Sequence, residues 1–348
     1  MNFDDIRAYP RRQFRAYWKR LTDDPHFQSL LHSAGEGLEN LQKGVKRIQT
    51  WAQFRKVMAR LVDFVIDHTT DGISYSGLEN IPRRKGAIYI STHRSTSLDP
   101  VLFNHMLYRH SGKTAFNAAG DNLLHTPWLG HLIRLNRGFI VRRQIEDMDE
   151  KLEEAKKLSA YIRSLTDRGK SVWIAQRGGR AKDGVDRTDS AVLAMLKMAH
   201  DEKSWEEFSS QVDLIPVAIS YEEIPLDTLL VKDHMGLVDK SDSRRDSAQV
   251  MDELRQPKRR IHIHLSPAVR AAKRKDIVGG IDRSIVNGVR LWDSNHQAAN
   301  LLEQLKTGVS SGGSWIADKV KALNPELAKK LLELYAAPVI SRRTLEGR

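Results

Sequence analysis

The feature that most constrains this chain is an alternation of short apolar runs with longer helical patterns. Between residues 72 and 270, runs of β-favouring residues end in small polar turns, and most are followed by a helical pattern of apolar residues. Strands that alternate with helices predict an α/β domain with a mostly parallel central sheet flanked by helices. The expected strands lie within residues 72–77, 88–90, 114–120, 139–141, 171–176, 213–220 and 259–265.

The same pattern divides the chain into three expected regions. Residues 1–70 form an N-terminal helical region, in which Phe54, Leu61 and Val65 lie at helical spacing. We interpret it as a packed helical subdomain; an amphipathic segment on a membrane surface is the second interpretation. Residues 71–270 form the α/β domain. Residues 271–348 form a C-terminal helical region, with a flexible break at residues 310–314.

Composition narrows the classes of function. The 348 residues contain no cysteine, which excludes disulfides, thiolate catalysis and cysteine-bound zinc. The formal net charge of +12 points to an anionic partner. No apolar run approaches the roughly 20 residues that span a bilayer, and the first residues are acidic where a secretion signal is basic. We therefore expect a cytoplasmic protein, including one bound peripherally to the cytoplasmic face of a membrane.

One strand end carries a histidine and an aspartate. After the strand expected at residues 88–90, a polar turn holds His93, and Asp99 and Pro100 suit the N-cap and first position of a helix. A carboxylate can orient an imidazole and leave its other nitrogen free as a general base. The alternative is a plain helix cap beside a loop histidine. This stretch alone favours the alternative, because an Asp-Pro pair at a helix start needs no catalytic explanation.

Two further strand ends carry positive charge. Arg142 and Arg143 follow the strand at residues 139–141; a phosphate-binding role and a solvated strand end explain them equally well. The strand at residues 171–176 runs into a turn with Gly178, Gly179 and Arg180. Glycines allow a close approach of backbone N–H groups to an anion. Neither a Walker sequence nor a dinucleotide fingerprint is present.

The ends of parallel strands lie at one edge of a sheet, so these three stretches are expected to converge there. A base beside a phosphate cradle suits transfer of a group onto a hydroxyl of a phosphorylated acceptor. No GxSxG sequence follows one of the expected strands, so direct attack by the acceptor is simpler than a covalent intermediate. His262 and His264 are expected on one side of a strand. They lack an obvious third ligand, so we interpret them as strand residues and expect no metal.

Four ordered blocks of this sequence resemble the glycerolipid acyltransferases, which include glycerol-3-phosphate and 1-acylglycerol-3-phosphate acyltransferases. The resemblance covers about residues 72–225. The first block resembles the family's His-x4-Asp motif, although five residues separate His93 from Asp99. Gly178 stands where many lysophosphatidate-type members have Glu, and the Gly-Gly-Arg form is similar to the soluble plastid glycerol-3-phosphate type. The blocks are residues 93–99, 138–143, 173–180 and 215–219.

The resemblance implies roles for these residues. His93 would take the proton of the acceptor hydroxyl, and Asp99 would orient and charge-balance the imidazole. The residues implied in substrate binding are Arg94, Ser95, Arg142, Arg143, Gly178, Gly179 and Arg180. The donor would be acyl-CoA or acyl carrier protein, with no cofactor. The acceptor would be a phosphorylated glycerol, at an anionic membrane surface and with no nucleic acid involved.

Two other functions stay open at this point. One is an inactive acyltransferase-like protein that binds an anionic membrane or a nucleic acid, which the unusual spacing of His93 and Asp99 keeps open. The other is an acyltransferase for a different lysolipid. The phosphorylated acceptor is favoured because cationic residues follow two of the strand ends.

Overall fold

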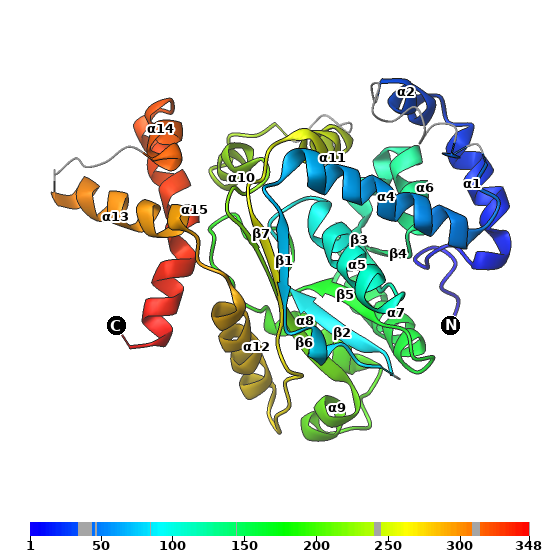
Figure 1. The fold of residues 1–348 in the computed structure, drawn as a ribbon. Helices are drawn as coiled ribbons and strands as arrows, with labels where there is room; N and C mark the ends of the chain where they lie inside the picture. The colour runs from blue at the N-terminus through cyan, green and yellow to red at the C-terminus, as the bar shows by residue number, and fades with distance from the viewer. Residues whose placement is uncertain are drawn as a thin grey trace.

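The computed structural model describes residues 1–33, 44–45, 47–83, 85–143, 145–239, 245–307 and 314–347. In this part of the chain a seven-stranded sheet has the order β1-β7-β6-β2-β5-β3-β4 (Figure 1). The paired neighbours run parallel except β6 and β7, which are antiparallel. The expected α/β class with a mostly parallel sheet is confirmed. The strands are β1 (Ile73–Ser76), β2 (Ala87–Ser91), β3 (Phe116–Gly120), β4 (Gly138–Val141), β5 (Val172–Ala175), β6 (Asp213–Tyr221) and β7 (Ile261–Leu265).

Helices cover both faces of the sheet. On one face lie α4 (Trp51–Thr69) and α5 (Leu98–Ser111), and on the other α7 (Met148–Thr166), α8 (Ser190–Met198) and α12 (Arg274–Gly288) (Figure 1). The other helices are η1 (Arg11–Gln13), α1 (Phe14–Thr22), α2 (Pro25–Ser33), η3 (Leu78–Asn80), η4 (Asp121–His125), α6 (Pro127–Leu135), α9 (Trp205–Gln211), α10 (Asp227–His234), α11 (Arg245–Arg255), α13 (Asp293–Thr307), α14 (Trp315–Lys321) and α15 (Pro325–Leu345).

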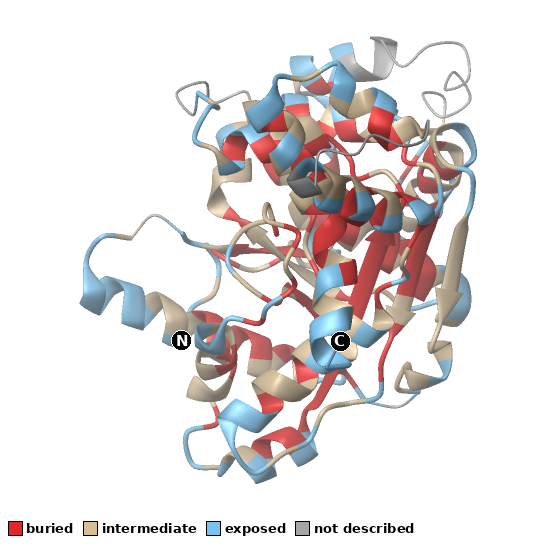
Figure 2. Ribbon diagram, turned by 90° about the vertical axis from the view of Figure 1, so that its left-hand side faces the viewer, coloured by how far each residue is buried: buried red, intermediate tan, exposed pale blue. Residues whose placement is uncertain are grey.

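The central strands are buried on both faces, which explains their continuous apolar sequence. Every residue of β2 and β6 is buried, and the strands form the inner layer in Figure 2. Successive side chains of β2 enter different cores because they point to opposite faces of the sheet. Tyr89 belongs to the core beneath α5, whereas Ile88 and Ile90 belong to the core beneath α7.

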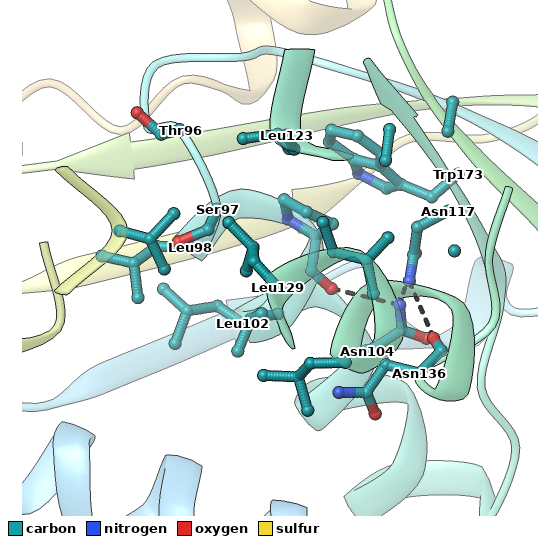
Figure 3. Close-up of a pocket in the computed structure, with 18 of the residues that line it drawn as sticks. Thr96, Ser97, Leu98, Leu102, Asn104, Asn117, Leu123, Leu129, Asn136 and Trp173 are labelled. Carbon is teal, nitrogen blue, oxygen red and sulfur yellow. Dashed lines mark hydrogen bonds between the residues drawn. The ribbon is translucent and has the colours of Figure 1, made fainter. Parts of the chain in front are cut away.

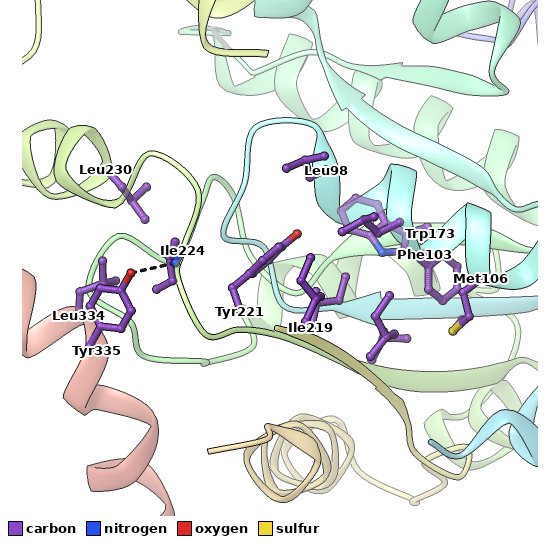
Figure 4. Packing of buried hydrophobic residues seen from close by; sticks show 14 of the residues in the cluster. Leu98, Phe103, Met106, Trp173, Ile219, Tyr221, Ile224, Leu230, Leu334 and Tyr335 are labelled. Carbon is purple, nitrogen blue, oxygen red and sulfur yellow. Dashed lines mark hydrogen bonds between the residues drawn. The ribbon is translucent and has the colours of Figure 1, made fainter. Parts of the chain in front are cut away.

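One core cluster joins residues from all three regions expected from the sequence. It contains Val62 of α4, Tyr89 and Trp173 of the sheet, and Leu331 and Tyr335 of α15 (Figure 4). The boundaries near residues 70 and 270 stay predictions. The described residues include no helix long and apolar enough to cross a membrane.

The C-terminal helices differ in part from their expected limits. The sequence predicts a long helix over residues 275–306 with a break near Gly279 and Gly280 or near Gly288; in the structure it is divided between α12 and α13 after Gly288. A Cβ at Gly288 would lie 2.5 Å from Cδ2 of His264, so a side chain there would collide with the sheet. The last helix extends to Leu345, with Pro338 inside it, rather than ending near Ala337. Residues 310–313 of the expected flexible break lie outside the described residues.

His262 and His264 lie in a ladder of serine and histidine side chains between β1 and β7. Ser74 Oγ lies 2.8 Å from Nδ1 of His262, and Ser76 Oγ lies 2.9 Å from its Nε2. Ser76 Oγ also lies 2.8 Å from Nδ1 of His264. Burial, followed by the positive charges of Arg290 and His264, lowers the pKa of His262 to about 4. His262 is therefore neutral in the folded protein at neutral pH.

This ladder predicts a loss of stability in mild acid. The folded pKa of His262 lies below its unfolded value of about 6.5, so its contribution is complete above that pH and is lost as the pH falls toward 4. Between pH 7 and pH 5 the loss amounts to about 2 kcal/mol. Urea unfolding at both pH values should show a smaller loss for His262→Gln, which keeps hydrogen-bonding groups but does not titrate. Equal losses in the two proteins would contradict the assignment.

Candidate active site

The turn after β2 brings His93 and Asp99 together. Helix α5 begins at Leu98, with Ser97 as its N-cap, so the expectation that Asp99 is the N-cap and Pro100 the first helical residue is wrong. Asp99 lies inside the first turn of the helix and is fully buried. From there its carboxylate faces back into the preceding turn, where it accepts hydrogen bonds instead of capping its own helix.

Asp99 binds the turn at several points. Its Oδ2 accepts hydrogen bonds from Nδ1 of His93 at 3.0 Å and from the backbone N–H groups of Arg94 at 2.7 Å and Ser95 at 3.0 Å. The turn can therefore hold five residues between His93 and Asp99 and still bring their side chains within hydrogen-bond distance. Because Nδ1 of His93 donates to the carboxylate, the Nε2 nitrogen is left with a lone pair. The His93 side chain is 12% exposed and lines a cavity.

Tyr221, the last residue of β6, completes the surroundings of Asp99. Its hydroxyl donates to Oδ1 of Asp99 at 2.8 Å. Burial, and then the neighbouring Asp99 carboxylate, raise the pKa of Tyr221 well above its usual value, so the hydroxyl keeps its proton. Figure 4 shows Tyr221 among the residues of the buried cluster. Sequence reasoning missed this residue because nothing near Tyr221 in the chain indicates a partner 122 positions away.

A second buried acid holds the turn from the opposite side. Glu253 of α11 accepts hydrogen bonds from the backbone N–H groups of Thr96 and Ser97 and from the Ser97 hydroxyl, the last two at 3.0 and 3.1 Å. The Glu253 carboxylate therefore holds the backbone just before the helix, where the side chain of the N-cap, Ser97, makes no capping hydrogen bond. Burial raises the pKa of Glu253. Sequence analysis did not single out Glu253, which lies far along the chain from this turn.

Arg94 and Ser95 do not line the cavity, which corrects their expected role in contacting substrate. The Arg94 guanidinium is 4% exposed and lies 2.6 Å from the carboxylate of Asp186. Ser95 is fully buried, and its hydroxyl accepts a hydrogen bond from the backbone N–H of Asp99 at 2.9 Å. The two side chains are engaged in interactions within the protein that fix the turn.

The loop after β5 lies beside the His93 turn. The backbone N–H of Ala181 donates to the carbonyl of His93 at 2.7 Å. Gly179, with φ +76°, and Arg180 line the same cavity as His93, whereas Gly178 is not among its lining residues. Arg180 and Lys182 lie 3.7 and 2.7 Å from the carboxylate of Asp233, so two cations share one acid there.

The structure separates the two arginines that follow β4. Arg143 lines the cavity, and a Cβ at Gly120 would lie 2.7 Å from its guanidinium carbon. Arg142 is absent from the lining, and its guanidinium lies within 4 Å of the acids Asp5, Glu150 and Glu154. In the sheet β3 lies between β4 and β5, so the end of β4 is farther from His93 than the sequence suggested. Arg142 is therefore not a candidate phosphate-binding residue.

The cavity has a volume of about 580 Å³ and mostly apolar walls. The part lined by His93, Arg143 and Arg180 is called the mouth below, and α4, α5 and α6 supply apolar walls. Figure 3 shows Leu102 and Leu129 among the lining side chains, with Asn104 and Asn117 hydrogen-bonded to each other beside them. The apolar face of α4, which we interpreted first as a packing surface, is part of this wall. The apolar lining includes Phe54, Met58, Leu61, Val62, Leu98, Val101, Leu102, Leu129, Leu132 and Ile133.

The described residues contain no group of three or more His, Asp or Glu side chains that could hold a metal ion. The arrangement at the mouth instead combines an oriented imidazole, cationic side chains and an apolar cavity. Such a site can remove a proton from a hydroxyl group beside a bound anion and a bound apolar chain.

Comparisons with known proteins agree with the class of this site. Residues 72–220 match the family model described as Acyltransferase, and the expected resemblance to acyltransferases is confirmed. No curated protein matches the chain. The chain is similar to the crystal structure of the 1-acyl-sn-glycerophosphate (LPA) acyltransferase PlsC from Thermotoga maritima, with 17% identity, a TM-score of 0.41, and coverage of 86% of this chain and 98% of that one. That TM-score is too low for the likeness to support fold or function.

The bond from Tyr221 to Asp99 predicts a specific effect on turnover. Tyr221→Phe and Tyr335→Phe each remove a buried hydroxyl that donates to a carboxylate, at 2.8 Å on Asp99 and 2.7 Å on Asp227. Each substitution should lower the free energy of unfolding by about 1 kcal/mol. Only Tyr221→Phe should reduce acyl transfer and shift its pH profile, because only Asp99 orients His93. Equal activity of the two variants would show that Tyr221 has a structural role alone.

Proposed function

We propose that this protein transfers a fatty acyl group from a thioester donor to the hydroxyl of glycerol-3-phosphate or 1-acylglycerol-3-phosphate. The observation that carries the proposal is the hydrogen bond of 3.0 Å between His93 and the buried Asp99 at the mouth of an apolar cavity. A general base, a cationic rim and an apolar chamber are the three features that such a transfer requires. The family match over residues 72–220 supports the reaction class.

His93 acts as the general base in the proposed reaction. The acceptor oxygen attacks the carbonyl carbon of the thioester as its proton moves to Nε2 of His93. A C–O bond forms, and Asp99, bonded to Nδ1, stabilises the imidazolium. Collapse of the tetrahedral intermediate breaks the C–S bond, and the proton passes from His93 to the departing sulfur. The products are an ester and a free thiol.

The charged and apolar parts of the cavity suit the two substrates. Arg180 and Arg143, with the open backbone at Gly179, provide the cationic rim for the acceptor phosphate. Three cations, Arg143, Arg180 and Lys182, line the mouth with Asp121 and Asp233. The apolar walls of α4, α5 and α6 provide room for the acyl chain of the donor, which is acyl-CoA or acyl carrier protein. The net charge of +12 is consistent with either donor and with attachment to an anionic membrane surface.

Release of free thiol from acyl-CoA tests the reaction directly. Turnover should depend on glycerol-3-phosphate or on 1-acylglycerol-3-phosphate, and His93→Gln should reduce it about 10²- to 10⁴-fold. Asp99→Asn should also reduce it strongly. His110→Gln, on the exposed last turn of α5, is the matched control and should be fully active.

If acyl-CoA releases no thiol, the assay is repeated with a thioester of acyl carrier protein as the donor. Absence of turnover with both donors and both acceptors would contradict the proposal and favour an inactive protein that binds anionic surfaces. An Asp99→Asn variant that loses stability but keeps its activity would show that Asp99 serves the fold alone.

The position of Arg180 predicts a selective effect on the acceptor. Arg180→Gln should raise the KM for the acceptor about tenfold or more, with a smaller effect on the KM for the donor, because a charge-assisted hydrogen bond to phosphate is lost. Arg142→Gln is the control and should leave both values unchanged, since Arg142 pairs with acids outside the cavity. Equal effects of Arg180→Gln on both substrates would contradict a phosphate-binding role.

A further inference from the structure

We propose that a second anion site, separate from the catalytic mouth, is formed by three arginines around Trp51 and takes a phosphate group. The Trp51 cluster consists of Trp51, Arg11, Arg55 and Arg137. The guanidinium carbons of Arg11, Arg55 and Arg137 lie 4.2, 4.8 and 4.4 Å from the centre of the Trp51 ring. This site is independent of the proposed acyl transfer.

The strand register shows that the Trp51 cluster is remote from His93. Arg137 immediately precedes Gly138, which is level with Asn117 of β3. Asn117 is level with Trp173 of β5, which in turn is level with Tyr89 of β2. His93 follows β2 and Arg137 precedes β4, and these two strands are three spacings apart in the sheet, which is on the order of 15 Å at roughly 4.8 Å per spacing. Trp51, Arg55 and Arg137 nevertheless line the same cavity as His93.

The positive charge of the Trp51 cluster has no counter-charge in the described part of the chain. None of the three guanidiniums forms an ion pair with a described carboxylate; such pairs are found for Arg7, Arg142 and Arg180 instead. A carboxylate is the usual partner of a buried or half-buried guanidinium. Three like charges around one ring therefore leave a strong positive potential at this end of the cavity.

The arginines of the Trp51 cluster also retain hydrogen-bond donors. Arg55 donates to the carbonyl of Gly112 at 2.9 Å, and Arg137 to the carbonyl of Thr114 at 2.7 Å. A guanidinium carries five N–H donors, so each arginine retains several. Nε of Arg55 and the hydroxyl of Thr114 are buried without a partner. Stacking on Trp51 occupies the faces of the guanidiniums and leaves their N–H edges available to an anion.

The electrostatics agree with this geometry. Burial, and then the charges of Arg11 and Arg55, lower the pKa of Arg137 to about 9. Arg137 still carries its charge at neutral pH, so the repulsion persists in the folded protein. An anion bound among the three side chains would relieve it.

The number and type of donors indicate phosphate. A phosphate monoester carries about −1.5 to −2 charges at neutral pH. It therefore balances the charge of three guanidiniums better than a single carboxylate would. Arg11 is exposed, so the Trp51 cluster is reachable from solvent as well as from the cavity. The phosphate can come from a small molecule in solution or from a lipid headgroup.

Calorimetric titration of the full-length protein with inorganic phosphate tests the site. The titration uses an Arg180→Gln background, which weakens the proposed acceptor site, and a constant ionic strength. Phosphate should still bind in that background. Adding Arg55→Gln or Arg11→Gln should weaken binding about tenfold, the value of one charge-assisted hydrogen bond. Arg12→Gln is the matched control, since Arg12 is exposed, lies next to Arg11 and does not contact Trp51.

The outcomes separate the possibilities. Absence of phosphate binding in the Arg180→Gln protein, or binding that Arg11→Gln and Arg12→Gln weaken equally, would overturn the proposal. Arg11 is exposed, so its variant stays informative if Arg55→Gln fails to fold.

Sedimentation with phosphatidylcholine vesicles, with and without phosphatidate, then distinguishes the two sources of the phosphate group. A selective loss of phosphatidate-dependent binding in Arg11→Gln supports a headgroup, and unchanged vesicle binding supports a soluble phosphate.

Discussion

The rest of the candidate active site depends on the carboxylate of Asp99. Buried beneath the turn after β2, it accepts hydrogen bonds from the His93 ring, from two backbone N–H groups and from the Tyr221 hydroxyl. One charged group therefore sets the shape of the turn and the tautomer of the imidazole together. Burying an ionised carboxylate is costly unless its hydrogen bonds are satisfied, and these donors come from both the turn and β6. Orientation of the base is thereby coupled to the packing of the sheet.

The layout of the cavity follows from the order of the strands. Strands β2 and β5 are neighbours, so the His93 turn and the Arg180 loop meet directly and share a backbone hydrogen bond. Strand β4 lies beyond β3, so only Arg143 of its two arginines reaches the cavity, while Arg142 pairs with acids on another surface. The helices α4, α5 and α6 close the apolar interior. The charged mouth and the apolar chamber are therefore formed by different elements.

Much of the fold could be predicted because the relevant signals are local. The period of apolar residues indicated strands and helices, and their alternation indicated a mostly parallel sheet. Within the site, His93 and Asp99 are close in the chain, so their pairing was a reasonable prediction. Tyr221 and Glu253 could not be predicted, since their partners lie more than a hundred positions away. The roles of Arg94 and Ser95 were misjudged because sequence position does not reveal which way a side chain faces from a tight turn.

The sequence by itself determined the class of fold, the strand-end positions of the polar turns, and a resemblance to acyltransferases that the family match over residues 72–220 confirms. These follow from local periodicity and short motifs, which depend on neighbours along the chain. Only the tertiary structure decided which of the charged side chains share a cavity and which acids support His93. It also decided that three arginines surround Trp51 with no ion pair to an acid of the described residues. Those properties depend on strand order and on helix packing, because both bring together residues that no local pattern connects.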